Sequence, residues 1–276
     1  MFEDKVIPLD VWVSQFVDWL VDNYRDVFQA LKWPVEQTLN GFDAGLNALS
    51  PLIVIAVLAF AAWKFSGKGL AIFTVITLTV IGLLGLWMET MTTLAMVLSS
   101  VIFCALVGIP IGIWAGRSDA FEAGIRPVLD AMQTTPAFVY LVPIVMLFSV
   151  GNVAGVLATI VFALPPIIRL TSLGIRQVHP ELVEAAQAFG ATNRQVLLRV
   201  QVPLAMPTIL AGLNQTIMMA LSMVVIAALI GAGGLGSPVI LGLNTLDLGR
   251  AVIGGLSIVL MAIVLDRITQ SMAQKK

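Results

Sequence analysis

The sequence predicts an all-α membrane protein with about seven transmembrane helices, and its composition and charge pattern support this fold class. The chain has 276 residues, of which 59% are hydrophobic and only 11% charged, whereas soluble domains carry roughly 25% charged residues. Six stretches contain no charge and approach or exceed the length needed to cross a hydrocarbon core of about 30 Å. In lipid, such runs satisfy their backbone hydrogen bonds by forming helices.

The two longest uncharged stretches are each too long for one crossing. As single helices, residues 131–168 would run roughly 57 Å and residues 200–246 roughly 70 Å, at about 1.5 Å per residue. The expected turning points are Gly151-Asn152 and the glycine cluster at 231–236. The predicted spans are residues 50–65, 69–88, 92–116, 135–150, 153–170, 207–231 and 250–268.

Residues 1–48 are too polar to span a membrane and form a separate amphipathic tail. Apolar residues recur at helical spacing, and aspartates occupy the opposite face, so we expect an interfacial helix on the periplasmic side. Trp33-Pro34 is expected to break this helix. Bracing of the spans is the favoured role, and docking of a binding protein is the alternative. Residues 49–89 then form two accessory spans, and residues 90–270 form the core.

A long polar segment between the fifth and sixth spans predicts a helix–turn–helix that projects from the bilayer. His179-Pro180 opens the first helix, with proline where no donor is lost. Gly190 permits a sharp turn. Thr192 and Gln195 have capping-box spacing and are expected to start the second helix. Pro203 marks the return into the membrane.

This polar segment, about residues 171–204, also carries a recognisable motif. It reads Glu-Ala-Ala, three residues, glycine, nine residues, then apolar-x-apolar-proline, which resembles the EAA loop of ABC importer permeases. The resemblance implies a type I permease core of five helices and a loop that contacts an ATPase. The implied coupling residues are Glu184, Ala185, Ala186, Gly190, Arg194 and Pro203. An ordinary cytoplasmic helical hairpin is the alternative.

Three further runs look like permeases that import glycine betaine, proline betaine or choline, and they suggest a role in osmoprotection. They are residues 129–143, 163–169 and 231–236. The resemblance implies a homodimer with two cytoplasmic ABC ATPase subunits and a periplasmic or tethered substrate-binding protein. ATP and Mg would be bound by the ATPase, and no cofactor by this chain.

The distribution of basic residues predicts the orientation in a bacterial inner membrane. If the EAA loop is cytoplasmic, so are the loops at 64–68 and 117–134 and the C-terminus, and eleven of the fifteen basic residues then lie inside. Ten of the sixteen acidic residues lie outside. The expected arrangement is therefore a periplasmic N-terminus and a cytoplasmic C-terminus, with lipid around the spans.

Several other functions find little support in the residues. There is no Ser-His-Asp or Cys-His arrangement and no metal-ligand cluster, so we expect neither an enzyme nor a metal site. A net charge of −1 gives no reason to expect nucleic acid. No predicted span carries a charge near its middle, which argues against a secondary carrier or channel. Three alternatives are kept: a secondary carrier or channel, a permease for another small solute, and a structural membrane protein.

Two groups of residues inside the spans have a predicted role. Gly108, Gly112 and Gly116 repeat on one helix face and are expected to allow close helix packing. A path for the substrate between two subunits would be lined by residues at the start of the fourth predicted span and in the sixth. Aromatic faces there would attract quaternary ammonium groups. The candidates are Gln133, Thr134, Thr135, Phe138, Tyr140, Asn214 and Ser222. Helix–helix hydrogen bonding is the alternative for each of them.

Overall fold

The computed structural model describes residues 8–274, and within this range the chain forms helices and no strand. Residues 1–7, 275 and 276, which include Lys5 and the two terminal lysines of the charge count, lie outside the described residues. Within them, the predicted all-α fold class is confirmed. The helices are α1 (Leu9–Ala48), α2 (Pro51–Ser66), α3 (Lys68–Leu83), α4 (Trp87–Arg117), α5 (Asp119–Thr134), η1 (Ala137–Tyr140), α6 (Leu141–Phe148), α7 (Asn152–Arg176), α8 (Pro180–Ala188), α9 (Asn193–Val196), η2 (Leu197–Gln201), α10 (Val202–Ala227), η3 (Ala228–Ile230), α11 (Gly236–Thr245) and α12 (Leu248–Gln274).

Across residues 8–274, four helical segments are long and apolar enough to span a membrane, against the seven spans expected. They are Trp87–Arg117, Asn152–Arg176, Asn193–Ile230 and Leu248–Met272. The count rises to six if α1 with α2, bent by 108°, and α5 with α6, bent by 103°, are each one span. Each expected span has a helical counterpart, but that for residues 135–150 is only the short η1 and the eight-residue α6.

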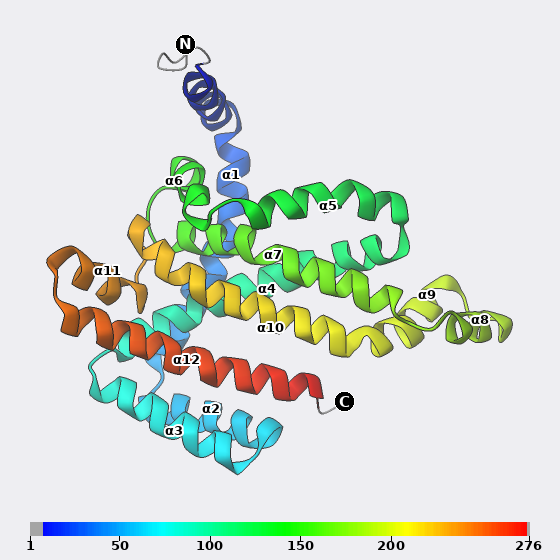
Figure 1. The fold of residues 1–276 in the computed structure, drawn as a ribbon. Coiled ribbons are helices and arrows are strands. Elements are labelled where there is room, and N and C mark those ends of the chain that lie inside the picture. Colours follow the sequence, from blue (N-terminus) through cyan, green and yellow to red (C-terminus); the bar gives the residue numbers. More distant parts are fainter. Residues whose placement is uncertain (1–7, 275–276) are drawn as a thin grey trace, which may run out of the picture.

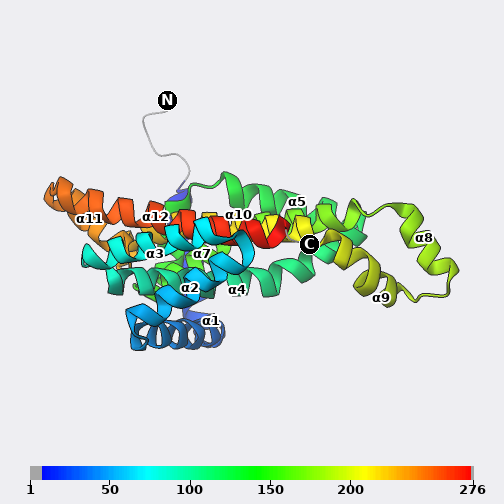
Figure 2. The ribbon, with the colours of Figure 1, turned by 90° about the horizontal axis from the view of Figure 1, so that it is seen from below.

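The long helices lie side by side and share one direction in the molecule. In Figure 1, α4, α7, α10 and α12 run lengthwise, while α1 crosses them. Figure 2 shows α8 and α9 projecting beyond the bundle at one end, with α11 at the other. The polar segment that carries the motif therefore extends away from the apolar body.

The N-terminal helix continues through Pro34, so the expected break at Trp33-Pro34 was wrong. Pro34 lies inside α1, and the only non-helical backbone angles within this helix are at Tyr24 (φ −124°, ψ 18°). A proline in a helix interior costs about 3 kcal/mol or more. Val35 and Leu39 are 4% and 2% exposed in the core, and burying each stabilises by about 1.5–3 kcal/mol. Tertiary packing therefore outweighs the cost of the proline.

Residues 117–134, which were expected to form a cytoplasmic loop, are instead mostly the helix α5. Ser118 caps this helix by accepting a hydrogen bond from the Phe121 amide at 3.3 Å. Asp119 and Glu122 occupy its first turn, where negative charge favours a helix. The helix runs back along α7 (Figure 1). Its charged residues are typical of a loop, but Asp119, Glu122 and Asp130 form ion pairs with α7.

The centre of the bundle is α7, which packs between α4 and α10. The predicted packing role of the small residues is confirmed, because a Cβ at Gly112 would lie 2.5 Å from the Thr171 Cβ and one at Gly116 2.9 Å from the Ile175 Cβ. A Cβ added at Gly108 would lie even closer to the side chain of Ile167. On the other side of α7, Gly212 of α10 faces Leu170, with the added Cβ 3.0 Å from the Leu170 Cβ.

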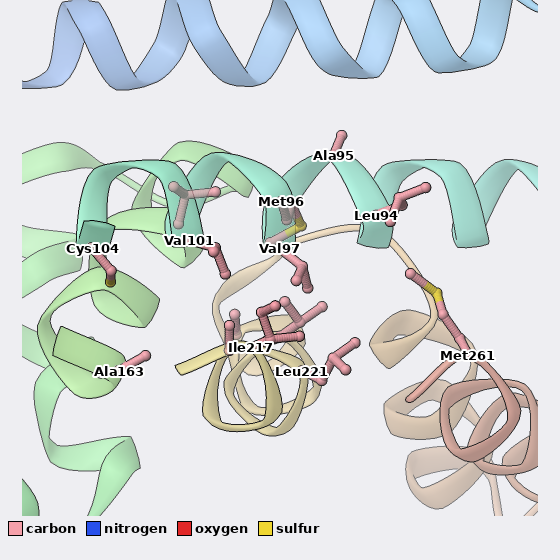
Figure 3. Packing of buried hydrophobic residues seen from close by; sticks show 14 of the residues in the cluster. Leu94, Ala95, Met96, Val97, Val101, Cys104, Ala163, Ile217, Leu221 and Met261 are labelled. Carbon is pink, nitrogen blue, oxygen red and sulfur yellow. The ribbon is translucent and has the colours of Figure 1, made fainter. Parts of the chain in front are cut away.

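A continuous apolar core joins these helices. Figure 3 shows side chains of α4, among them Val97 and Cys104, facing Ile217 and Leu221 of α10 and Ala163 of α7, with Met261 of α12 beside them. Met96 and Ala163 are fully buried. The close contacts at the glycines and this shared core make α4, α7 and α10 one packed unit.

Candidate functional site

The predicted coupling segment is connected directly to α7. Only residues 177–179 separate α7 from α8, and α8 begins with Pro180 at its first position, as the sequence predicts. Glu181 lies in the first turn, where a carboxylate interacts favourably with the helix dipole. Val178 in the connection is 9% exposed. The short linker and its buried residue mean that a displacement of α8 would act on the end of α7.

The turn after α8 is closed by two backbone hydrogen bonds around Gly190. The Gly190 amide donates to the Gln187 carbonyl at 2.8 Å, and the Ala191 amide to the Ala186 carbonyl at 3.0 Å. Gly190 has φ +83°, a left-handed conformation that glycine adopts without steric cost. These bonds form a Schellman motif, so the sharp turn expected at Gly190 is present.

The second helix begins where the capping-box spacing places it. Thr192 Oγ1 accepts from the Gln195 amide at 3.4 Å, and the Gln195 side chain accepts from the Thr192 amide at 2.8 Å. After α9, the π-helical turn η2 leads without a gap into α10. Pro203 is the second residue of α10 and has no amide to donate.

Most of the predicted coupling residues are open to solvent. Glu184, Ala185, Gly190, Arg194 and Pro203 are exposed, and Ala186 is half-buried. No residue of α8 is buried. The first helix of the segment therefore packs only loosely against its neighbours α9 and η2, and its exposed side chains are available to another protein.

Sequence reasoning missed an apolar stripe on this helix. Leu182 is 46% exposed and Phe189, directly before Gly190, is 92% exposed. With Ala185 they follow the i, i+3, i+7 spacing of one helix face. This spacing is visible in the sequence and could have found them. Such a stripe suits recognition by a groove, the common way in which an amphipathic helix binds.

Charged contacts between α5 and α7 were also missed. Arg169 and Asp130 lie 2.5 Å apart between Nη2 and Oδ1. Arg176 contacts Asp119 at 2.6 Å and Glu122 at 2.9 Å, and donates to the Ala115 carbonyl of α4 at 2.8 Å. The partners are 39 to 61 residues apart in sequence, so no local pattern could have paired them.

Five of the seven predicted path residues cluster where α5 turns into η1 and α6. The elbow is stiffened by local hydrogen bonds: Tyr140 Oη donates to the Met132 carbonyl at 2.6 Å, and Thr135 Oγ1 to the Ala131 carbonyl at 2.8 Å. Thr134 Oγ1 donates to the Asp130 carbonyl at 3.0 Å. Gln133 is half-buried. Phe138 is 60% exposed, so its ring faces outward from this single chain.

The other two predicted path residues differ in their surroundings. Asn214 Nδ2 donates to Asp266 Oδ1 at 3.0 Å, and Asn214 Oδ1 accepts from Thr269 of α12. For Asn214 the geometry therefore shows helix–helix hydrogen bonding, which is the alternative to lining the path. Ser222 is exposed and donates only to the Met218 carbonyl of its own helix, at 3.1 Å.

The glycine cluster at 231–236 is anchored at the opposite end of the bundle. Thr93 Oγ1 accepts from the Leu235 amide at 2.7 Å, and Asn152 Oδ1 accepts from the Gly233 amide at 2.6 Å. The segment leads into α11, a short helix that the sequence analysis had not assigned. Within residues 8–274 there is also no group of three or more metal-ligating side chains.

Known proteins resemble this chain over most of its length. A permease protein of the glycine betaine/proline betaine transport system, ProW of Escherichia coli K12, is 55% identical over 273 residues, which cover 99% of this chain and 77% of the relative. OpuAB, the permease protein of a glycine betaine transport system in Bacillus subtilis 168, is 47% identical over 270 residues, covering 98% of this chain and 96% of the relative.

The fold is also found among solved structures. An inward-facing structure of the MetNI methionine ABC transporter aligns with a TM-score of 0.60 at 22% identity, covering 66% of this chain and 91% of that chain. At this identity the likeness concerns the fold, and it agrees with the type I permease core expected from the sequence. The family of binding-protein-dependent transport system inner membrane components matches residues 108–276. The chain therefore belongs to that family.

Proposed function

We propose that this chain is the membrane-spanning subunit of an ATP-driven importer that takes up glycine betaine or a related quaternary ammonium osmolyte, such as proline betaine or choline. The observation that carries the proposal is the projecting α8, none of whose residues is buried in the described chain. The relatives named for glycine betaine transport supply the substrate class. A permease for another small solute is the second candidate.

In the proposed assembly, two copies of this chain pair in the bacterial inner membrane. Each copy contributes one coupling segment, so two cytoplasmic ABC ATPase subunits are served by two loops. ATP and Mg are bound by those ATPases, and this chain performs no hydrolysis. A periplasmic or tethered binding protein delivers the substrate. The interfacial α1, with its exposed Trp12, Phe16 and Trp19, contacts lipid at the outer surface.

The proposed orientation is supported by the side of the molecule on which the basic turns lie. The α2–α3 turn, the α4–α5 turn and the end of α12 all face the side from which α8 projects (Figure 1). Lys64 and Lys68 flank the first of these turns, and Arg117 precedes the second. An excess of lysine and arginine marks the cytoplasmic side. This supports a cytoplasmic coupling segment and C-terminus and a periplasmic N-terminus.

ATP binding closes the ATPase pair, and the two coupling helices move with it. Glu184, Ala185, Ala186, Gly190, Arg194 and Pro203 form the coupling site in this proposal. The elbow around Phe138 and Tyr140, together with the exposed Ser222, contributes to a path between the two copies. An aromatic face there would attract a quaternary ammonium group.

Reconstitution tests the proposal directly. The chain is expressed with a candidate ABC ATPase and a candidate binding protein from the same organism, purified, and placed in proteoliposomes containing an ATP-regenerating system. We expect the ATPase to co-purify, and glycine betaine uptake to require both ATP and the binding protein. Uptake by this chain alone, driven by a proton or sodium gradient, would instead identify a secondary carrier.

A further inference from the structure

The helix α5 has little apolar packing beyond its first turn, where the rings of Phe121 and Trp114 of α4 stack with centroids 3.9 Å apart. Of its sixteen residues only Leu129 is buried, at 4% exposure. By contrast, α7 is held by glycine contacts with α4 on one side and α10 on the other. A movement of α7 would therefore carry α4 and α10 with it, whereas α5 would follow only through other contacts.

Two arginines of α7 make polar contacts with α5, one near each end of that helix. Arg176, the last residue of α7, contacts Asp119 and Glu122 in the first turn of α5. Arg169, seven residues earlier, contacts Asp130 near the other end. At about 1.5 Å per residue, the two contacts are separated by about 10 Å along α7 and by about 12–17 Å along α5. Two contacts separated in this way oppose both sliding and rotation of α5 on α7.

The contacts lie between the coupling segment and the predicted path. Arg176 is four residues before Pro180, where α8 begins. At the other end, Asp130 precedes the elbow whose hydrogen bonds join Tyr140 to Met132 and Thr135 to Ala131. A rigid connection from α8 to the elbow therefore runs through α7, the two arginines and α5.

We propose that Arg169 and Arg176 are positioning residues, which pin α5 to α7 so that movement of the coupling helix reaches the elbow at residues 134–140. This inference rests on the proposed ATP-driven function and adds a specific route for the movement. The pairs are partly solvent-exposed, with side-chain exposures of 40% for Arg169 and 55% for Asp130. Pairs this exposed contribute little to stability, so their removal should leave the fold intact.

The Arg169–Asp130 pair offers the sharper test because each residue has one charged partner. The complete complex carrying R169Q, D130N or the charge swap R169D/D130R is reconstituted, and glycine betaine uptake and ATP hydrolysis are measured in the same vesicles. We expect each single variant to keep hydrolysing ATP while uptake per ATP falls by about fivefold or more. The swap should recover most of the loss, which a merely structural role would not explain.

R126Q is the matched control. Arg126 pairs with Glu122 at 3.2 Å within α5 itself, so its loss removes an ion pair without separating the two helices. Its uptake per ATP should equal that of the wild type. The inference is overturned if R169Q and D130N also keep the wild-type ratio, or if a swap variant that melts like the wild type couples no better than the singles. If the wild-type complex shows no ATP-driven uptake, the proposed function fails, and this inference fails with it.

Discussion

The amide of Ala191 donates to the carbonyl of Ala186 at 3.0 Å, and this hydrogen bond closes the last turn of the coupling helix. It can form because Gly190, between them, has φ +83°. No atom lies within 4 Å of a Cβ added at Gly190. A side chain there would meet open space, so the backbone conformation alone makes glycine favourable at this position.

We therefore expect Gly190→Val to weaken coupling through backbone strain. A left-handed conformation costs an L-residue about 1–2 kcal/mol, and a β-branched side chain is among the least suited to it. The turn should open, with less ATPase co-purifying and slower uptake. Gly190→Asn should be milder, because asparagine tolerates this conformation. As a control, Gly255→Ala in the ordinary helix α12, also with open space around the Cβ, should behave like the wild type.

Phe189 provides a second prediction about the same segment. Its side chain is 92% exposed, so Phe189→Ala removes no internal packing and should leave the melting temperature unchanged. If the ring enters an apolar pocket on the ATPase, its truncation should cost about 2 kcal/mol or more of binding, measured as ATPase affinity in detergent. Leu246→Ala is the control, because Leu246 is 91% exposed near the other end of the bundle. Equal ATPase affinity of the wild type, Phe189→Ala and Leu246→Ala would contradict the anchoring role of Phe189.

The coupling segment was largely predictable because its signals are local. Pro180 at the helix start, Gly190 at the turn and the Thr192–Gln195 capping box each act over three or four residues. Four of the seven expected spans, those at residues 92–116, 153–170, 207–231 and 250–268, were predictable for a similar reason, since the length of an uncharged stretch is a local property. The exposure of Phe189 was not, because it depends on which other elements leave it uncovered.

Errors arose where distant contacts decide the structure. Pro34 lies inside a helix because Val35 and Leu39 are buried against the bundle, and nothing near Pro34 in sequence announces this. Residues 117–134 form a helix against α7 through ion pairs whose partners lie 39 and 57 residues away. The path candidates were chosen by residue type and by their place in the predicted fourth and sixth spans, and Asn214 proved to bond to α12.

The anchor of the glycine cluster yields a third prediction. Thr93 is 1% exposed and accepts from the Leu235 amide, so Thr93→Val leaves a buried donor without a partner. Such a loss costs about 1–3 kcal/mol, and the purified protein should melt at a lower temperature. Thr93→Ser should retain the bond.

Thr90→Val is the matched control for this site. Thr90 is also 1% exposed in α4, but its hydroxyl donates to the Leu86 carbonyl, which already accepts from the Thr90 amide at 3.0 Å. Replacing it leaves no backbone group unsatisfied. A melting temperature lowered as much by Thr90→Val as by Thr93→Val would show that the Leu235 bond has no special role.

The close approach of α4 and α7 gives a fourth prediction. In Gly112→Ala the new Cβ would lie 2.7 Å from the Ile168 carbonyl oxygen, and backbone at that distance must shift. Overpacking of this kind costs about 1–3 kcal/mol. Alanine is favoured over glycine in a helix by about 1 kcal/mol, which offsets only part of the cost. Gly82→Ala in α3, with its nearest neighbour at 3.7 Å, should be neutral or stabilising in the same thermal assay.

The elbow gives the last prediction, which concerns the substrate. Phe138→Ala and Tyr140→Ala each remove an aromatic face, and a cation–π contact at a partly exposed site contributes about 0.5–1 kcal/mol or more. We expect uptake of glycine betaine to fall in both, while expression and ATPase activity are retained. Tyr140→Phe separates the two roles of that residue, because it keeps the ring and loses only the bond to the Met132 carbonyl. Should both alanine variants transport as the wild type does, neither ring lines the path, and the elbow acts on transport only through its position.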